Sequence, residues 1–249
     1  MKQLKCNFAK PTCTAKQTAQ AVNALIKAGA AYNLLDNSDF RNPVNQRGKT
    51  SYTSADAKYT IDRWLRPNVK VLVDLAPGYI SVTNTDTTSA RTFQQKVTAL
   101  NGYNGPVTVA ACLDDGTILL GTVDADSDAT SGNQYLWTIS GQDKGIGAIL
   151  YNEGYYKALG LNIESEKTVN IVWVAMYKGE YTLETLPEYA PKGYAVELME
   201  CLRYYHVYSN ETARPSLGID CSPPMRLNSI SQGTFTIEDA TYFFNSADL

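Results

Sequence analysis

The chain has 249 residues, a formal net charge of −3 and an ordinary apolar fraction, so it can bury a sizeable core as one large domain or two small ones. Its lysines and arginines are spread along the sequence without a basic stripe, which argues against a nucleic-acid-binding protein. The sequence contains neither an apolar run of membrane-spanning length nor an apolar stretch of the secretory type near its start, so we expect a chain made in the cytoplasm without membrane insertion.

Residues 1–31 differ from the rest and predict a short N-terminal helix over residues 15–29. Thr14 can cap this helix and Gly29 can end it. Small or apolar residues recur at a spacing of three and four, and the resulting stripe is too short for an independent coiled coil. The segment is therefore expected either to associate with copies of itself, as an attachment and oligomerisation segment of a trimer, or to fold back on its own chain.

Residues 32–249 read as short strands separated by turns, which predicts a second domain that is mainly β. The clearest signal is a hairpin at Asp115-Gly116, where both residue types tolerate positive φ. Closely spaced strands without intervening helices favour a β-sandwich over βαβ units. The predicted strands cover residues 58–66, 69–75, 79–83, 91–100, 107–113, 117–123, 134–139, 146–150, 158–163, 168–178, 235–237 and 241–244.

One predicted strand is apolar at every position between Ile171 and Met176, which implies that both of its faces are covered. The only convincing helix in this part of the chain spans residues 193–208 and has an apolar face. We therefore expect this helix to cover one face of the strand.

Three stretches of the sequence resemble phage and prophage tail-fibre proteins. The first comprises residues 33–40 (Asn-Leu-Leu-Asp-Asn-Ser-Asp-Phe), 43–48 and 59–64, the second residues 172–179, and the third residues 197–205. Their order and spacing extend over nearly the whole chain beyond residue 31. The second stretch departs from the usual pattern, because Met176-Tyr177 stands where Leu-Glu is common.

The resemblance implies a jelly-roll β-sandwich similar to carbohydrate-binding modules, with one helix in its C-terminal half. Such proteins belong to the virion, at the tip of a phage tail or its fibre, and commonly assemble as homotrimers beside other tail proteins. They adsorb to polysaccharide or teichoic acid on the host cell. The expected function is thus non-catalytic adhesion to a host cell-surface glycan; a structural tail or baseplate adaptor and a polysaccharide depolymerase remain alternatives.

We predict neither a catalytic nor a metal site. The segment Asp124–Asp128 has only the first half of a calcium loop, and the oxygens of Asp36, Asn37 and Asp39 form an equally incomplete cluster. The single histidine, His206, has no nucleophile at a suitable spacing. The five cysteines form no Cys-x-x-Cys pair, so we expect reduced thiols and no cofactor.

Tyrosine is the compositional outlier, with 17 Tyr against 6 Phe and 3 Trp. A tyrosine ring offers an apolar face and a polar tip, which suits half-buried sheets as well as surfaces that hold polar ligands. Sugar binding needs such rings on loops or on an open sheet face. The sequence-predicted ligand-binding residues are Tyr103, Tyr155 and Tyr156, followed by Trp137 beside Tyr135.

Overall fold

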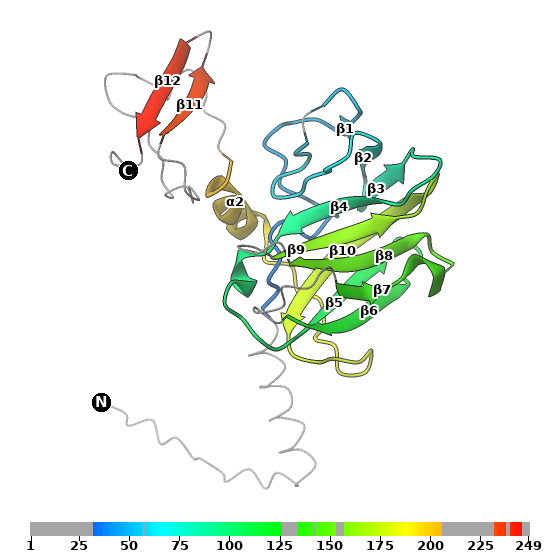
Figure 1. The fold of residues 1–249 in the computed structure, drawn as a ribbon. Coiled ribbons are helices and arrows are strands. Elements are labelled where there is room, and N and C mark those ends of the chain that lie inside the picture. The colour runs from blue at the N-terminus through cyan, green and yellow to red at the C-terminus, as the bar shows by residue number, and fades with distance from the viewer. Residues whose placement is uncertain are drawn as a thin grey trace, which may run out of the picture.

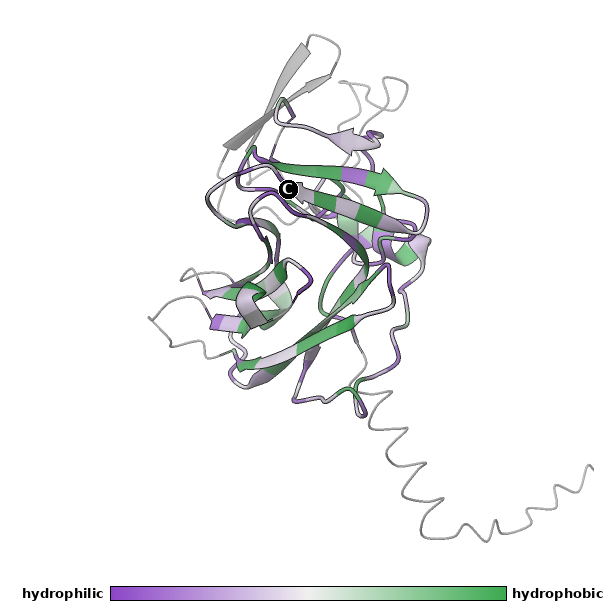
Figure 2. Ribbon diagram, turned by 90° about the vertical axis from the view of Figure 1, so that its right-hand side faces the viewer, coloured by the Kyte–Doolittle hydropathy of each residue, from purple (hydrophilic) through white to green (hydrophobic). Residues whose placement is uncertain are grey.

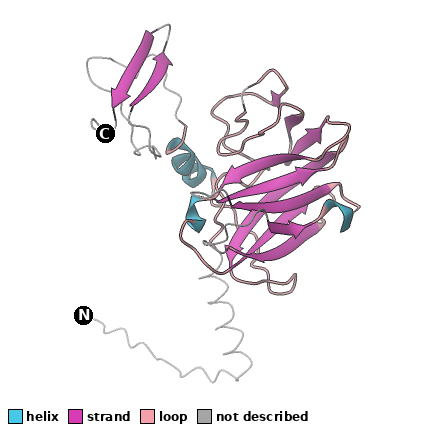
Figure 3. Ribbon diagram, viewed as in Figure 1, coloured by secondary structure: helices cyan, strands magenta, loops and turns pink. Residues whose placement is uncertain are grey.

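The computed structural model describes residues 32–56, 58–125, 134–141, 143–152 and 157–205, and the backbone of the strands at 232–237 and 240–245. This part of the chain is mainly β, with two antiparallel sheets, a separate pair of strands and one α-helix (Figures 1 and 3). The prediction of a mainly β protein is therefore confirmed. Among the described residues no helix has the length and apolar character needed to span a membrane.

The larger sheet has six strands in the order β1-β2-β3-β10-β5-β6. Its members are β1 (Ser51–Tyr52), β2 (Val71–Ala76), β3 (Tyr79–Asn84), β5 (Pro106–Leu113), β6 (Ile118–Asp124) and β10 (Thr168–Lys178). The smaller sheet has the order β4-β9-β8-β7, formed by β4 (Arg91–Lys96), β7 (Gln134–Trp137), β8 (Ile146–Asn152) and β9 (Lys157–Ile163). The remaining elements are the 3-10 helices η1 (Thr98–Leu100) and η2 (Ile139–Gly141), the helix α2 (Tyr194–Leu202), and the pair β11 (Gln232–Ile237) and β12 (Ala240–Asn245).

The strand pairing is nested. β3 pairs with β10 in the larger sheet, and the strands adjoining them in sequence, β4 and β9, pair in the smaller sheet. The chain thus passes to the smaller sheet after β3, returns to the larger sheet after β4, crosses again after β6 and returns after β9. Between these nested pairs lie two hairpin pairs, β5 with β6 and β7 with β8.

The inward faces of both sheets share one hydrophobic core. Burial alternates along the strands, as in β3, where Ile80 and Val82 are fully buried and the residues between them are not. Figure 2 shows the same alternation as hydrophobic and polar bands along the strands. Buried residues of the larger sheet lie in a single cluster with those of the smaller sheet, such as Phe93 and Leu161.

One end of this core is closed by three aromatic rings. Trp64 stacks on Phe93, with ring centroids 4.9 Å apart, and Phe40 meets Trp64 edge-on at 5.2 Å. Both Trp64 and Phe40 come from the irregular segment that precedes β2, and both are buried, as the sequence predicted. This contact attaches the segment to β4.

The strand predicted over residues 58–66 is absent from the described structure. Residues 58–66 form a turn in which the Thr60 N–H donates to the Trp64 carbonyl, and only single bridges link Leu65 to Tyr59 and to Gln94. Residues 33–40 form no regular strand either, but three backbone hydrogen bonds attach them to β10: Leu34 N–H donates to the Met176 carbonyl, Phe40 N–H to the Val172 carbonyl, and Val174 N–H to the Ser38 carbonyl. Both segments therefore contact a neighbouring strand only at a few positions, Leu65 with Gln94 of β4 and residues 34, 38 and 40 with β10.

The second face of β10 is covered by residues 179–192 and not by the predicted helix. Tyr189 stacks on Trp173 with ring centroids 4.4 Å apart and planes 3° from parallel. Tyr181 and Leu186 complete a second cluster around the buried Tyr177. The prediction that both faces are covered was right, but the choice of α2 as the cover was wrong, because Tyr181, Leu186 and Tyr189 of the irregular segment between β10 and α2 cover this face.

Gly121 allows the edge strands of the two sheets to approach each other. A Cβ at Gly121 would lie 2.3 Å from the Leu136 carbonyl oxygen of β7. We therefore expect Gly121→Ala to push β6 and β7 apart and to lower the free energy of unfolding by about 1–3 kcal/mol, the usual range for overpacking. Urea denaturation measures this loss, and Ile118→Ala, at a half-exposed position of the same strand, is the matched control; equal losses in both variants would contradict the close approach.

Candidate functional site

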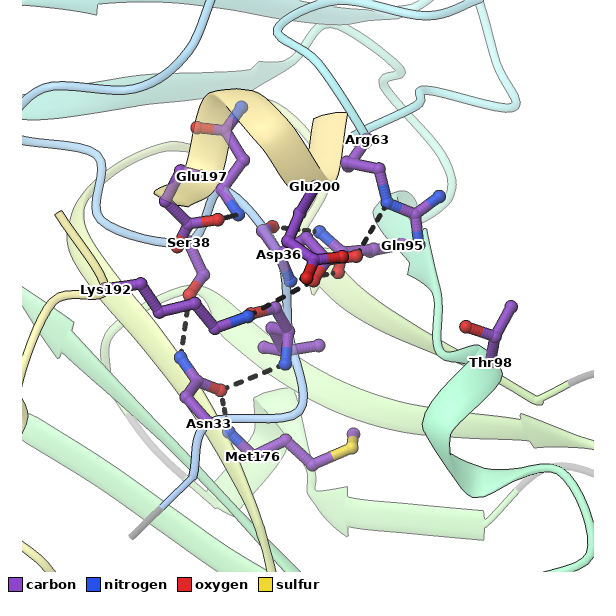
Figure 4. Close-up of polar contacts among 12 residues, drawn as sticks. Asn33, Asp36, Ser38, Arg63, Gln95, Thr98, Met176, Lys192, Glu197 and Glu200 are labelled. Carbon is purple, nitrogen blue, oxygen red and sulfur yellow. Dashed lines mark hydrogen bonds and ion pairs between the residues drawn. The ribbon is translucent and has the colours of Figure 1, made fainter. Parts of the chain in front are cut away.

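The first segment (residues 33–48 and 59–64), β10 and the region around α2 meet in one buried polar network (Figure 4). Asn33 lies at its base, where its side-chain oxygen accepts hydrogen bonds from the backbone N–H groups of Leu35 and Met176. Its amide nitrogen donates to Ser38 Oγ at 2.8 Å and to the Val174 carbonyl at 3.2 Å. The Asn33 side chain thus adds two hydrogen bonds to the backbone hydrogen bonds by which Leu34, Ser38 and Phe40 join β10.

Asn37 makes the corresponding connections to the turn and to α2. Its amide nitrogen donates to the carbonyls of Val44 and Asp62, at 2.8 and 2.7 Å. Its backbone N–H donates to a carboxylate oxygen of Glu197 at 2.5 Å, and its carbonyl accepts the indole N–H of Trp64. Asn37 has a φ of 50°, a conformation that asparagine tolerates better than most residues.

Asp36 carries the charge at the centre of the network. Arg63 Nε donates to one carboxylate oxygen at 2.9 Å, and Lys192 Nζ approaches the other at 3.2 Å. The Gln95 side chain donates to the Asp36 carbonyl and accepts its backbone N–H, so that the residue is also fixed to β4. Burial acts to lower the pKa of Lys192, but the carboxylates of Asp36 and Glu197 outweigh it, and the pKa is raised.

Two arginines of the first stretch stack on tyrosines that follow α2. The Arg63 guanidinium lies 3.4 Å from the ring centroid of Tyr204, and that of Arg47 lies 3.8 Å from the ring centroid of Tyr205. Arg63 holds a φ of 72°, which is strained for a side chain of this size and persists only where contacts on all sides fix it. The network therefore fixes three distant parts of the sequence in one arrangement.

Burial shifts the pKa of two acidic groups in this network, Glu197 and Asp62, upward. Glu197 and Asp62 are both buried, and desolvation raises the pKa of each above its ordinary value, although hydrogen bonds act in the opposite direction. Burial also raises the pKa of the Cys201 thiol. Cys201 and Cys112 are free cysteines, as predicted; the remaining three lie outside the described residues.

The candidate cation cluster of the first stretch is occupied by protein groups. Asp36 pairs with two cations, the Asn37 side chain binds backbone groups, and Asp39 forms a salt bridge with Arg41. The described residues contain no group of three or more His, Cys, Asp or Glu side chains placed to hold a metal ion. Most of the other calcium candidate, residues 126–128, and His206 lie outside the described residues.

Of the sequence-predicted sugar-binding residues, only Tyr103 and Trp137 lie in the described part of the chain. Trp137 is only 6% exposed, so its ring packs in the core and offers no open platform. Tyr103 is half-buried against the core, and its hydroxyl donates to the Pro106 carbonyl at 3.1 Å. Tyr155 and Tyr156 lie outside the described residues, although β9, which follows them, begins at Lys157, whose ammonium donates to the Tyr103 carbonyl.

A surface pocket of about 320 Å³ lies at the outer side of the smaller sheet, where β7, β8 and β9 adjoin η2. Tyr135 lines it and is 59% exposed, in contrast to Trp137 two residues later. Asn162 and Gly147 face each other across the β8–β9 pairing on the sheet face opposite to the core. The lining comprises Tyr135, Trp137, Thr138, Ile139, Ser140, Gly147, Asn162 and Glu164.

A β-bulge explains why Tyr135 and Trp137 face opposite ways. Tyr135 pairs with Ile149 but Trp137 pairs with Ala148, so the register shifts between them. Because neighbouring residues of a strand point to opposite faces, the shift directs Tyr135 outward and Trp137 into the core. Alternation alone had placed both rings on one face, and nothing in the sequence marks the bulge.

The pocket offers one ring and several polar groups. Within the described part of the chain, the side chains of Asn162 and Glu164 make no hydrogen bond or ion pair, so both can bind a ligand. Thr138 and Ser140 are exposed and add hydroxyl groups. The indole N–H of Trp137 is buried without a partner among the described residues. The arrangement suits a small polar molecule with one apolar face.

Comparison with protein-family models, with curated protein sequences and with solved structures found no match to this chain.

The buried carboxyl of Glu197 makes the stability of the fold depend on pH. Glu197→Gln keeps an oxygen that accepts the Asn37 N–H but removes the buried charge. Above the ordinary glutamate pKa of 4.5 the unfolded chain ionises, while the raised pKa of the folded state opposes ionisation, so Glu197 costs stability as pH rises. We expect the variant to gain free energy of unfolding, relative to the native chain, between acidic and neutral pH.

Chemical denaturation across this pH range measures the difference between the two chains. Glu197→Ala is the second variant, and it should lose about 1–3 kcal/mol because the Asn37 N–H is left without its partner. A Glu197→Gln variant that is destabilised more at neutral than at acidic pH would show that the carboxylate is favourably paired, contrary to this prediction.

Proposed function

We propose that this chain is a receptor-binding protein of a phage tail, which adheres to carbohydrate on the host cell surface without catalysing a reaction. The observation that carries the binding half of the proposal is the pocket on the outer side of the smaller sheet. An exposed tyrosine ring lies there beside an amide, two hydroxyl groups and a carboxylate, none of them needed for the core.

The chemistry of this pocket matches that of a sugar ring. A pyranose has an apolar face of C–H groups, which packs on an aromatic ring such as that of Tyr135, and hydroxyl groups around its edge. The Asn162 amide both donates and accepts hydrogen bonds, so it can bind neighbouring hydroxyls. The volume of about 320 Å³ lies at the lower end of small-molecule pockets, which favours one sugar unit over a long chain.

The phage-tail half of the proposal rests on the resemblance described above. Its support is that Asn33 and Asn37 of the first stretch bond to Val174 of the second stretch and to Glu197 of the third, in a single network. The nested pairing of β3 with β10 and β4 with β9 supports a jelly-roll sandwich, although hairpins replace the inner pairs of that fold. Fold alone does not determine function, so the pocket carries the binding claim.

The number of carboxyl groups that line the pocket favours binding over hydrolysis. Most glycosidases use two carboxyl groups on either side of the scissile bond. Among the residues that the structure describes, Glu164 supplies the one carboxyl group that lines this pocket. We therefore propose adhesion, with depolymerase activity as an outcome that the test below can detect.

The test uses the labelled full-length protein and intact bacteria of candidate hosts, before and after periodate oxidation of their surface glycans. The proposal expects binding that periodate abolishes and that releases no reducing sugar. Release of reducing sugar would instead identify a depolymerase. Failure to bind cells, together with retention on other tail proteins, would identify a structural adaptor.

Tyr135→Ala is expected to weaken cell binding about tenfold or more, which is the usual cost of losing a central aromatic contact. Tyr135→Phe keeps the ring and should retain most of the binding. Tyr194→Ala removes a similarly exposed tyrosine from α2 and is the matched control. Equal binding by the Tyr135→Ala and Tyr194→Ala variants would exclude this pocket as the receptor site.

We also propose that the protein acts as a homotrimer and that residues 1–31, which lie outside the described residues, hold it together. Deletion of residues 1–30 should convert the trimer to a monomer in multi-angle light scattering, while circular dichroism keeps its β character. An unchanged trimer after the deletion would assign the contact to residues 32–249.

A further inference from the structure

We infer that the pocket prefers a sugar that carries an ammonium group, an amino sugar, over the same sugar with a carboxylate. This inference rests on the proposed function, because it names the class of saccharide that the pocket binds. Glu164 is the only charged residue among the eight that line the pocket. The other polar groups of the lining are neutral, so the sign of the field at the ligand is set by one carboxylate.

The charge of Glu164 is not neutralised by the described residues around it. Two lysines lie in the neighbouring turns. The aliphatic part of Lys167 lies beside Gly145, near Glu164, but its ammonium makes no ion pair within the described part of the chain. Lys144 forms its salt bridge with Asp115 on the β5–β6 turn. A positively charged ligand can therefore become the counter-ion of Glu164.

The size of the preference follows from the position of Glu164 at the pocket edge. Its side chain is half-buried, so an ion pair there resembles a surface pair, worth about 0.2–1 kcal/mol, and a like charge costs a similar amount. This corresponds to a change in affinity of up to about fivefold for each unit of ligand charge. The expected order is amino sugar, then neutral sugar, then acidic sugar.

The experiment is a titration of the full-length protein, followed by NMR, with three probes that differ in charge: methyl glucoside, methyl glucosaminide below neutral pH, and methyl glucuronide. We expect the glucosaminide to bind up to about fivefold more tightly than the glucoside, and the glucuronide more weakly by a similar factor. Glu164→Gln should make the three affinities converge. Glu166→Gln removes an exposed charge two residues away, outside the lining, and should leave the order unchanged.

The failures of the two proposals can be told apart. Glucuronide binding as tight as glucosaminide binding, or an order that survives Glu164→Gln, would overturn the charge preference while the neutral probe still demonstrates a sugar site. Absence of binding by all three probes would also overturn the charge preference, because that proposal states that the pocket binds a single sugar unit. Periodate-sensitive cell binding unaffected by Tyr135→Ala would then place the receptor site elsewhere on the chain.

Discussion

The fold depends on the buried asparagine network that holds the segment before β2 against the rest of the molecule. This segment crosses one end of the core without pairing continuously with any strand, so its backbone N–H and C=O groups need other partners. Asn33 and Asn37 supply them through side-chain amides, which both donate and accept. Shorter or purely apolar side chains at these positions would leave several buried backbone groups unsatisfied.

The charges in the network act on specificity more than on stability. Buried ion pairs such as that of Asp36 with Arg63 gain little net free energy, because desolvation offsets their attraction. Their geometric demand is strict, however, since Arg63 must hold a positive φ and stack on Tyr204 while it reaches Asp36. We therefore interpret the network as a device that selects one arrangement of the first segment, β10 and α2.

The sequence predicted the strands well where periodicity determines them and poorly in the irregular segment before β2, where the backbone closes turns. The bounds of β10 were predicted without error, because an eleven-residue stretch with a continuous apolar centre allows few other strand bounds. Residues 58–66 have the composition of a strand, yet the hydrogen bond between Thr60 and Trp64 closes a turn. The pocket was missed for a related reason: one extra residue between Tyr135 and Trp137 reverses the faces of the two rings, and composition carries no signal for it.

That bulge connects the fold to the proposed site. Gly147 accommodates it, since a Cβ there would lie 3.1 Å from the Trp137 carbonyl oxygen and 3.2 Å from Ile139. The same strand β7 therefore sends Trp137 into the core and leaves Tyr135 on the outer face, beside Asn162 of β9. Because the buried ring fixes β7, Tyr135 projects from a backbone that is already held in place. A site of this kind loses little conformational entropy when it binds a ligand, which is the condition under which a few weak contacts to a sugar can suffice for recognition.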